Sequence, residues 1–166
     1  ARLPWILIGM IGGIGNSMIL GNFDSTFAAH PEMALYIPLI GGTGGNVGTQ
    51  SSAIVVQGLA NSSLDAKNTF KQVTKEAVVA LINATIISLL VYTYNFIRFG
   101  ATATVTYSVS ISLFAVVMFA SIFGTLVPMT LEKLKIDPAI ATGPFIAITN
   151  DIIGMMLYMG ITVLLS

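Results

Sequence analysis

The chain has 166 residues, of which 55% are hydrophobic and only 8% are charged, with a formal net charge of zero. A soluble domain carries about 25% charged residues, so this composition excludes an ordinary water-soluble protein, and the excess apolar surface must contact membrane lipid. The few scattered basic residues exclude a surface that neutralises nucleic acid, and the absence of cysteine excludes disulfides and thiolate metal sites.

Five apolar stretches are long enough to cross a hydrocarbon layer of about 30 Å as helices that rise about 1.5 Å per residue. In chain order they cover residues 5–23, 36–60, 77–97, 105–131 and 139–165. The alternation of apolar and polar residues that is typical of membrane β-barrels is absent. We therefore predict an all-α integral membrane protein with five transmembrane helices, which form one domain over residues 1–166.

The charged residues collect in the connections and indicate an orientation. If the amino end is cytoplasmic, Arg98 is the one basic residue outside, and six lie inside: Arg2, Lys67, Lys71, Lys75, Lys133 and Lys135. This bias predicts a cytoplasmic amino terminus and an outer carboxyl terminus in a plasma (inner) membrane. The chain begins at Ala1 without a recognisable signal peptide, so we expect an excised membrane domain.

Asp151 is the one acidic residue predicted to lie inside the membrane. It follows Pro138 by 13 residues and precedes Ser166 by 15, which places it near the midplane. A carboxylate at that depth costs about 2.5–3.5 kcal/mol on insertion scales and usually faces a bundle interior or a water-filled path. The alternatives are a structural hydrogen bond to a neighbouring Thr or Asn, or a protonated buried acid. Asp151 is the leading candidate for an ion-binding residue.

One carboxylate suits a proton or Na⁺ better than a divalent ion. A homodimer would supply a second one, because a two-fold axis along the membrane normal would bring two copies of Asp151 to one pore.

Five glycines between residues 41 and 48 form the second notable pattern. Each glycine lowers the stability of a soluble helix by about 1 kcal/mol relative to Ala, so we expect these glycines to serve helix contact or ion passage and not helix stability. Their spacing matches the small-xxx-small pattern of close helix contacts, but such a stretch can also break a helix and present carbonyl groups to a cavity. The polar side chains of Asn46, Thr49 and Gln50 favour a cavity.

The last span contains Gly143 and Pro144 shortly before Asn150 and Asp151. Proline lacks the donor for a helical hydrogen bond, so the helix is expected to bend or begin again at this point. Backbone carbonyls just before Asp151, such as that of Ala147, could then face water around an ion. Close packing explains the proline equally well.

No motif for catalysis is present: the sequence contains no glycine-rich loop with lysine, no Ser-His-Asp set and no Cys/His cluster. We predict that the protein is not an enzyme.

Two motifs resemble the MgtE family of magnesium channels and transporters. They are Tyr36-Ile37-Pro38 followed by Gly42-Thr43-Gly44-Gly45-Asn46-Val47-Gly48-Thr49-Gln50, and Gly143-Pro144 followed by Asn150-Asp151-Ile152-Ile153-Gly154. The resemblance spans essentially all 166 residues and includes the helix count and the order of the motifs.

The resemblance implies a homodimer with the ion path on its two-fold axis, lined by the second and fifth helices. Asp151 matches the family's ion-binding aspartate, Ala147 matches a position whose carbonyl faces the hydrated Mg²⁺, and Gly42 and Gly45 match pore-lining glycines. Mg²⁺ releases water reluctantly, so a wide site that keeps its water shell is chemically reasonable. The remaining positions assigned to the path are Asn46, Thr49, Gly143 and Asn150.

The sequence departs from the family at Thr49 and Gly143, where many relatives carry Asn, so the polar lining is expected to be thinner. Relatives often carry a cytoplasmic magnesium-sensing region that is absent from this sequence. Two alternatives to a passive Mg²⁺ path stay open: an exchanger that couples Mg²⁺ to Na⁺, and a membrane anchor or assembly module whose glycines serve packing alone.

Overall fold

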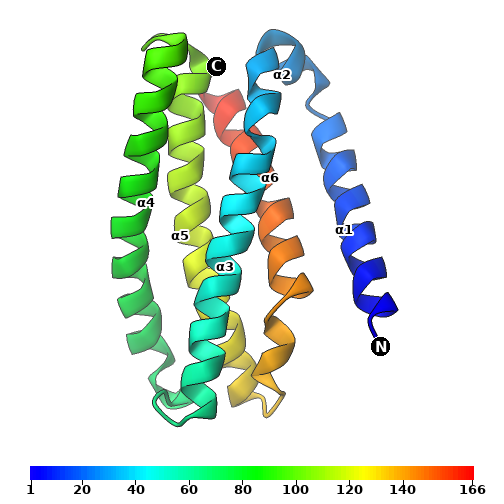
Figure 1. The fold of residues 1–166 in the computed structure, drawn as a ribbon, viewed down its shortest axis with the longest axis vertical. Helices are drawn as coiled ribbons and strands as arrows, with labels where there is room; N and C mark the ends of the chain where they lie inside the picture. The colour runs from blue at the N-terminus through cyan, green and yellow to red at the C-terminus, as the bar shows by residue number, and fades with distance from the viewer.

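The computed structural model describes the backbone of residues 1–166 and every side chain except that of Ala141, and each element in this described chain is a helix (Figure 1). The α-helices are α1 (Leu3–Gly21), α2 (Asp24–Ala29), α3 (Ile37–Ala60), α4 (Thr69–Phe99), α5 (Thr104–Lys133) and α6 (Pro144–Leu165). Three short 3₁₀ helices join them: η1 (Pro31–Tyr36), η2 (Ala66–Asn68) and η3 (Pro138–Ala141). The prediction of an all-helical protein is confirmed.

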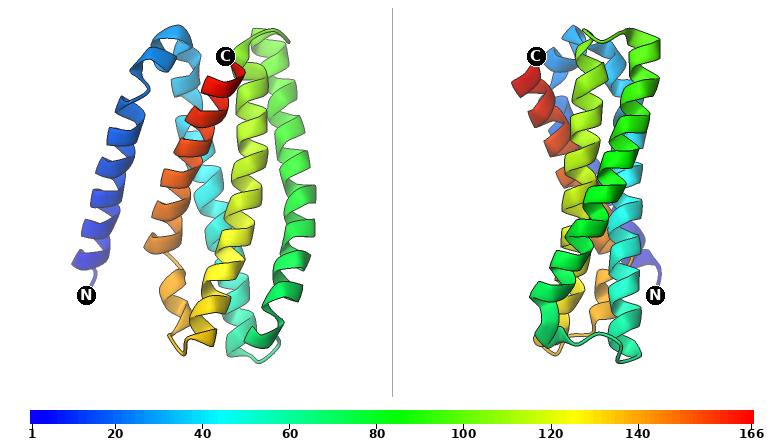
Figure 2. Two further views of the ribbon diagram at one scale, coloured as in Figure 1. Left: turned by 180° about the vertical axis from the view of Figure 1, so that it is seen from behind. Right: turned by 90° about the vertical axis from the view of Figure 1, so that its left-hand side faces the viewer.

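The long helices run up and down in a bundle (Figures 1 and 2). Helix α5 is the most buried and packs against α3, α4 and α6, whereas α1 stands at the edge and packs mainly against α6. The two chain termini lie toward opposite ends of the bundle. Helices α1 and α4 expose many large apolar side chains, as expected for contact with lipid.

Four helical segments are long and apolar enough to cross a membrane, over residues 3–21, 66–99, 104–133 and 144–165. The second predicted span is present as helix α3, which has 24 residues. Because of its glycines and polar side chains, it is not among the four segments that are apolar enough. Length and composition therefore support four of the five predicted spans.

Three segments differ from the expected boundaries. Helix α4 begins at Thr69, eight residues before the predicted span over residues 77–97. The segment between the first two spans contains α2 and η1, and η1 begins at Pro31, whose fixed φ suits a first helical position. The last predicted span is divided into η3 and α6, with α6 beginning at Pro144. Gly143 precedes it with φ +100°, a conformation that side-chain-bearing residues rarely adopt. The new helix start expected at Pro144 is thus confirmed.

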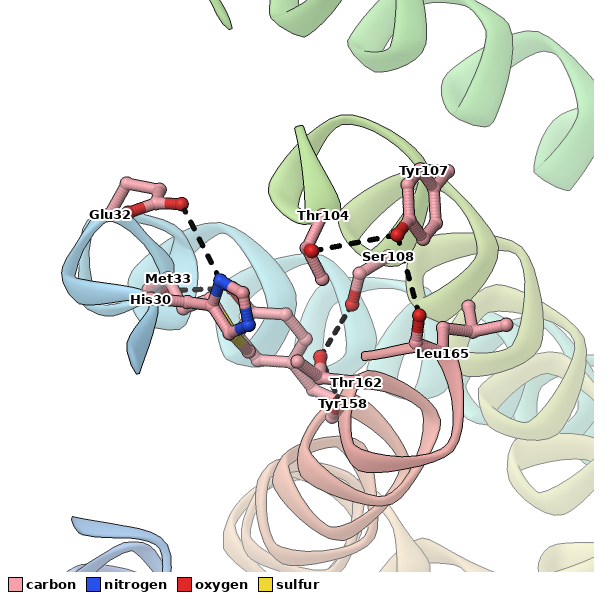
Figure 3. A network of polar contacts seen from close by, with 9 residues as sticks. All are labelled: His30, Glu32, Met33, Thr104, Tyr107, Ser108, Tyr158, Thr162 and Leu165. Atoms are coloured by element: carbon pink, nitrogen blue, oxygen red, sulfur yellow. Dashed lines mark hydrogen bonds and ion pairs between the residues drawn. The ribbon is translucent and has the colours of Figure 1, made fainter. Parts of the chain in front are cut away.

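Polar contacts hold the carboxyl-terminal half of α6 in place (Figure 3). The Ser108 hydroxyl of α5 is hydrogen-bonded to the Thr162 hydroxyl, and the Tyr158 hydroxyl donates to the Met33 carbonyl of η1 over 2.8 Å. All four residues are fully buried. Because Tyr158 lies two turns after Asp151 on the same helix, these contacts fix the rotation of α6 about its axis and therefore the direction of the Asp151 side chain.

Candidate cation site

The carboxylate of Asp151 lies against the backbone of α3 at two glycines. A Cβ atom built at Gly41 would be 3.4 Å from Asp151 Oδ1, and one built at Gly45 would be 3.5 Å from the same oxygen. No described residue donates a hydrogen bond to this carboxylate. Its charge must therefore be met by water, a proton or a cation, because a partly buried carboxylate without a donor is costly.

The carboxylate borders an open groove of about 660 Å³ between α3 and α6. The groove is lined by Gly41, Gly42, Gly45, Asn46, Thr49, Gln50, Ala53, Ala147 and Asp151. Six water molecules, the number in an octahedral shell, occupy about 180 Å³ at about 30 Å³ each. The volume of the groove therefore exceeds that of a cation with six water molecules.

Six of the eight residues assigned to the site from the sequence meet at this groove: Gly42, Gly45, Asn46, Thr49, Ala147 and Asp151. The other two lie elsewhere. Gly143 forms the start of α6, and Asn150 is 1% exposed and packs beside Gly48, with its Nδ2 donating to the Ile146 carbonyl over 3.0 Å.

Three lining residues were not assigned to the path from the sequence: Gly41, Gln50 and Ala53. Helical periodicity could have identified Ala53, which follows Thr49 by four positions, as Thr49 follows Gly45. Gln50 was noted for its polarity without a place in the path.

The glycines of α3 divide between two faces of the helix. On one face, Gly44 and Gly48 permit close contact, since a Cβ at Gly44 would lie 2.8 Å from Val116 Cγ1 and one at Gly48 would overlap the Asn150 side chain. On the other face, Gly42 has no atom within 4 Å of a built Cβ and borders the groove. Helix α3 continues without a break, so the predicted close helix contact is present, whereas the predicted helix break is wrong and the groove borders an intact helix.

Within the described chain, no group of three or more His, Cys, Asp or Glu residues gathers around Asp151 or elsewhere. A single carboxylate cannot replace the water shell of a divalent ion. The arrangement suits a hydrated cation held through its water molecules, or a cation shared with a second carboxylate.

Comparison with known proteins agrees with this geometry. Residues 37–161 match the model of the MgtE family, described as divalent cation transporters. The chain is 32% identical over 160 residues to the magnesium transporter MgtE of Bacillus subtilis. The aligned residues make up 96% of this chain and 35% of the relative. It is also 32% identical over 165 residues to the magnesium transporter MgtE of Thermus thermophilus. This alignment includes 99% of this chain and 36% of that protein.

The chain thus spans about a third of the length of the curated relatives it matches. The matched region contains all of α3 and residues 144–161 of α6, and hence every residue that lines the groove. These relatives are transporters, not enzymes. Together with the apolar helices, the family match shows that this membrane protein belongs to the MgtE family of divalent cation transporters.

Proposed function

We propose that this chain is a single transport domain that moves Mg²⁺ across a membrane as a homodimer, in which Asp151 of both subunits binds the hydrated ion near the midplane. The observation that carries the proposal is a partly buried carboxylate that receives no hydrogen bond from any described residue and borders a groove of about 660 Å³. The names of the related proteins support Mg²⁺ as the cargo.

The composition of the groove favours a hydrated ion. The side chains of Asn46, Thr49 and Gln50 offer neutral oxygen atoms, and the glycines keep the α3 side of the groove free of bulk. Water in the shell of Mg²⁺ directs its hydrogens outward, so it is bound by such acceptors without being displaced. The charge of Asp151 adds attraction that a neutral groove lacks.

The single charge of Asp151 and the open side of the groove both favour a dimer, in which a second subunit faces the groove. One carboxylate leaves a divalent ion half neutralised, whereas two copies of Asp151 facing one path would match its charge. We place the two-fold axis along the membrane normal, with α3 and α6 of each subunit lining the path.

In this proposal α3 also crosses the membrane, which brings the number of transmembrane helices to five. Its 24 residues would extend about 36 Å, enough to cross the hydrocarbon layer. Its polar face borders the groove, which removes that face from lipid. With five crossings, the amino terminus lies in the cytoplasm of a plasma (inner) membrane and the carboxyl terminus lies outside, in agreement with the positive-inside rule.

The purified chain in liposomes tests the proposal. We expect Mg²⁺ entry, read with an internal magnesium dye, when a Mg²⁺ gradient is imposed in the absence of Na⁺. Flux by this chain alone would leave any further cytoplasmic region a regulatory role. Flux only with an opposing Na⁺ gradient would instead identify an exchanger. No flux under either condition, from protein shown to be folded, would contradict transport by this domain and favour the assembly module.

Gly42→Val is expected to lower Mg²⁺ flux about tenfold without reducing stability. The new side chain would meet no atom of its own subunit within 4 Å of its Cβ, but it would occupy the groove opposite the ion. Valine is also more favourable than glycine in a helix. Gly160→Val on α6 is the matched control, because Gly160 is equally free of neighbours and does not line the groove. Equal flux from the two variants would contradict the role of Gly42 in the path.

A further inference from the structure

A second, smaller cavity also reaches Asp151. It has a volume of about 70 Å³, lies between α1 and α6, and is lined by Gly9, Gly12, Gly13, Asn16, Ile148 and Asp151. The large groove includes no residue of α1, so the two spaces approach Asp151 from different helices.

The cavity is produced by the way α1 docks on α6. Residues 9, 12, 13 and 16 share one face of α1, because side chains three and four positions apart are neighbours on a helix. A Cβ built at Gly12 would overlap the Ile148 side chain, so glycine at this position lets the two helices meet. At Gly9 and Gly13 a built Cβ would have no atom within 4 Å, and their missing side chains leave the space open.

Asn16 supplies a neutral polar group to this cavity. Its Oδ1 atom is shielded from solvent and accepts no hydrogen bond within the described chain. The Asp151 carboxylate, which borders the same cavity, also has no donor. Two oxygen acceptors that border one small cavity require an occupant that donates hydrogen bonds or carries positive charge. A volume of about 70 Å³ exceeds the 10–15 Å³ that one water molecule needs, so water can fill it.

We propose that Asn16 is a positioning residue of the cation site: its amide oxygen accepts hydrogen bonds from water that belongs to the shell of the cation at Asp151. Helix α1 then forms a third wall of the site, in addition to α3 and α6. Water bound to a cation turns its hydrogens outward. A neutral acceptor that contacts this water, and not the ion, therefore stabilises the shell without competing for the ion. This inference rests on the proposed function, since it concerns the ion held by Asp151.

The Mg²⁺ dependence of flux in liposomes tests the role of Asn16. Asn16→Leu is expected to raise the half-saturating Mg²⁺ concentration about tenfold, the lower range for loss of an outer-shell metal contact. Asn16→Asp keeps an acceptor at the cavity and is expected to retain or lower the half-saturating concentration. Ser17→Leu is the control, because Ser17 is the next residue of α1 but is exposed and does not line the cavity.

Gly13→Val tests the cavity without altering either polar group. The valine would enter the open space, displace water and raise the half-saturating Mg²⁺ concentration, whereas Gly15→Val, which is also free of neighbours but does not line the cavity, would not. This variant decides the outcome if Asn16→Leu fails to fold. Half-saturating concentrations equal to those of the controls would overturn the inference.

A parallel measurement with Asp151→Asn separates the two proposals. If Asp151→Asn removes flux while the Asn16 and Gly13 variants behave like their controls, the inference about α1 is wrong and the proposed function stands. If Asp151→Asn transports Mg²⁺ like the unmodified protein, the proposed function itself is wrong.

Discussion

Asp151→Asn is expected to abolish Mg²⁺ binding and flux and to leave the helix bundle folded. The substitution keeps the shape of the side chain and removes its charge, once per subunit. Since no described residue donates a hydrogen bond to the carboxylate, no internal network is lost. Removing an unpaired charge from a partly buried position is expected to leave stability unchanged or to increase it. The expected loss of Mg²⁺ affinity is at least about 100-fold, which corresponds to about 3 kcal/mol of binding free energy.

The measurement pairs Mg²⁺ flux in liposomes with thermal unfolding of the purified protein in detergent. Asp24→Asn is the matched control, because Asp24 begins the short helix α2 and its exposed side chain lies far from the groove residues in sequence. The control is expected to retain flux. Asp151→Glu is expected to give intermediate flux, since it keeps the charge but extends the carboxylate toward Gly41 and Gly45. Flux from Asp151→Asn at the unmodified rate would show that the ion is bound elsewhere.

The helical fold and the leading candidate for the site could be identified from the sequence because both depend on local information. Long apolar stretches specify helices in lipid, where each backbone group must be paired within its own segment. A single acidic residue inside such a stretch is conspicuous. The new start of α6 at Pro144 was equally predictable, because proline removes a helical donor regardless of the surrounding structure.

The continuity of α3 could not be predicted from its residues, because glycine disfavours a helix and only contacts with neighbouring helices offset that preference. Contacts with α5 and α6 through Gly44 and Gly48 stabilise α3 in a form that its intrinsic propensity opposes. The glycines of α3, together with Asn46 and Gln50, lower its hydropathy, so four helices and not five are apolar enough to be identified as spans from composition.

The placement of Asn150 and Asn16 depended on tertiary structure. Asn150 was assigned to the path as part of the motif that contains Asp151, but successive residues of a helix point about 100° apart, and Asn150 packs beside Gly48. Asn16 lies far from Asp151 in sequence, and its position beside the cavity depends on the docking of Gly12 against Ile148. No local pattern in the first span specifies that contact.

Gly124→Val is expected to cause the largest loss of stability of the substitutions considered. A Cβ at Gly124 would lie 2.5 Å from the carbonyl oxygen of Gly48 and 3.2 Å from its Cα, both of which are backbone atoms of α3. A flexible side chain could turn away, but a helix backbone cannot, so α3 and α5 must separate. Overpacking of this kind costs about 3 kcal/mol, and Gly124→Ala is expected to cost less but to act in the same direction.

The groove links this stability to transport, since α3 carries most of its lining residues and α5 holds α3 in place. Separation of α3 from α5 would disturb the approach of Gly41 and Gly45 to the Asp151 carboxylate, so Gly124→Val is expected to lower both the unfolding temperature and Mg²⁺ flux. Gly15→Val, at a glycine without neighbours, should change neither. Asp151→Asn is expected to lower flux without lowering the unfolding temperature, which would distinguish loss of the proposed ion ligand from loss of the helix contact. An unchanged unfolding temperature for Gly124→Val would contradict the close α3–α5 contact.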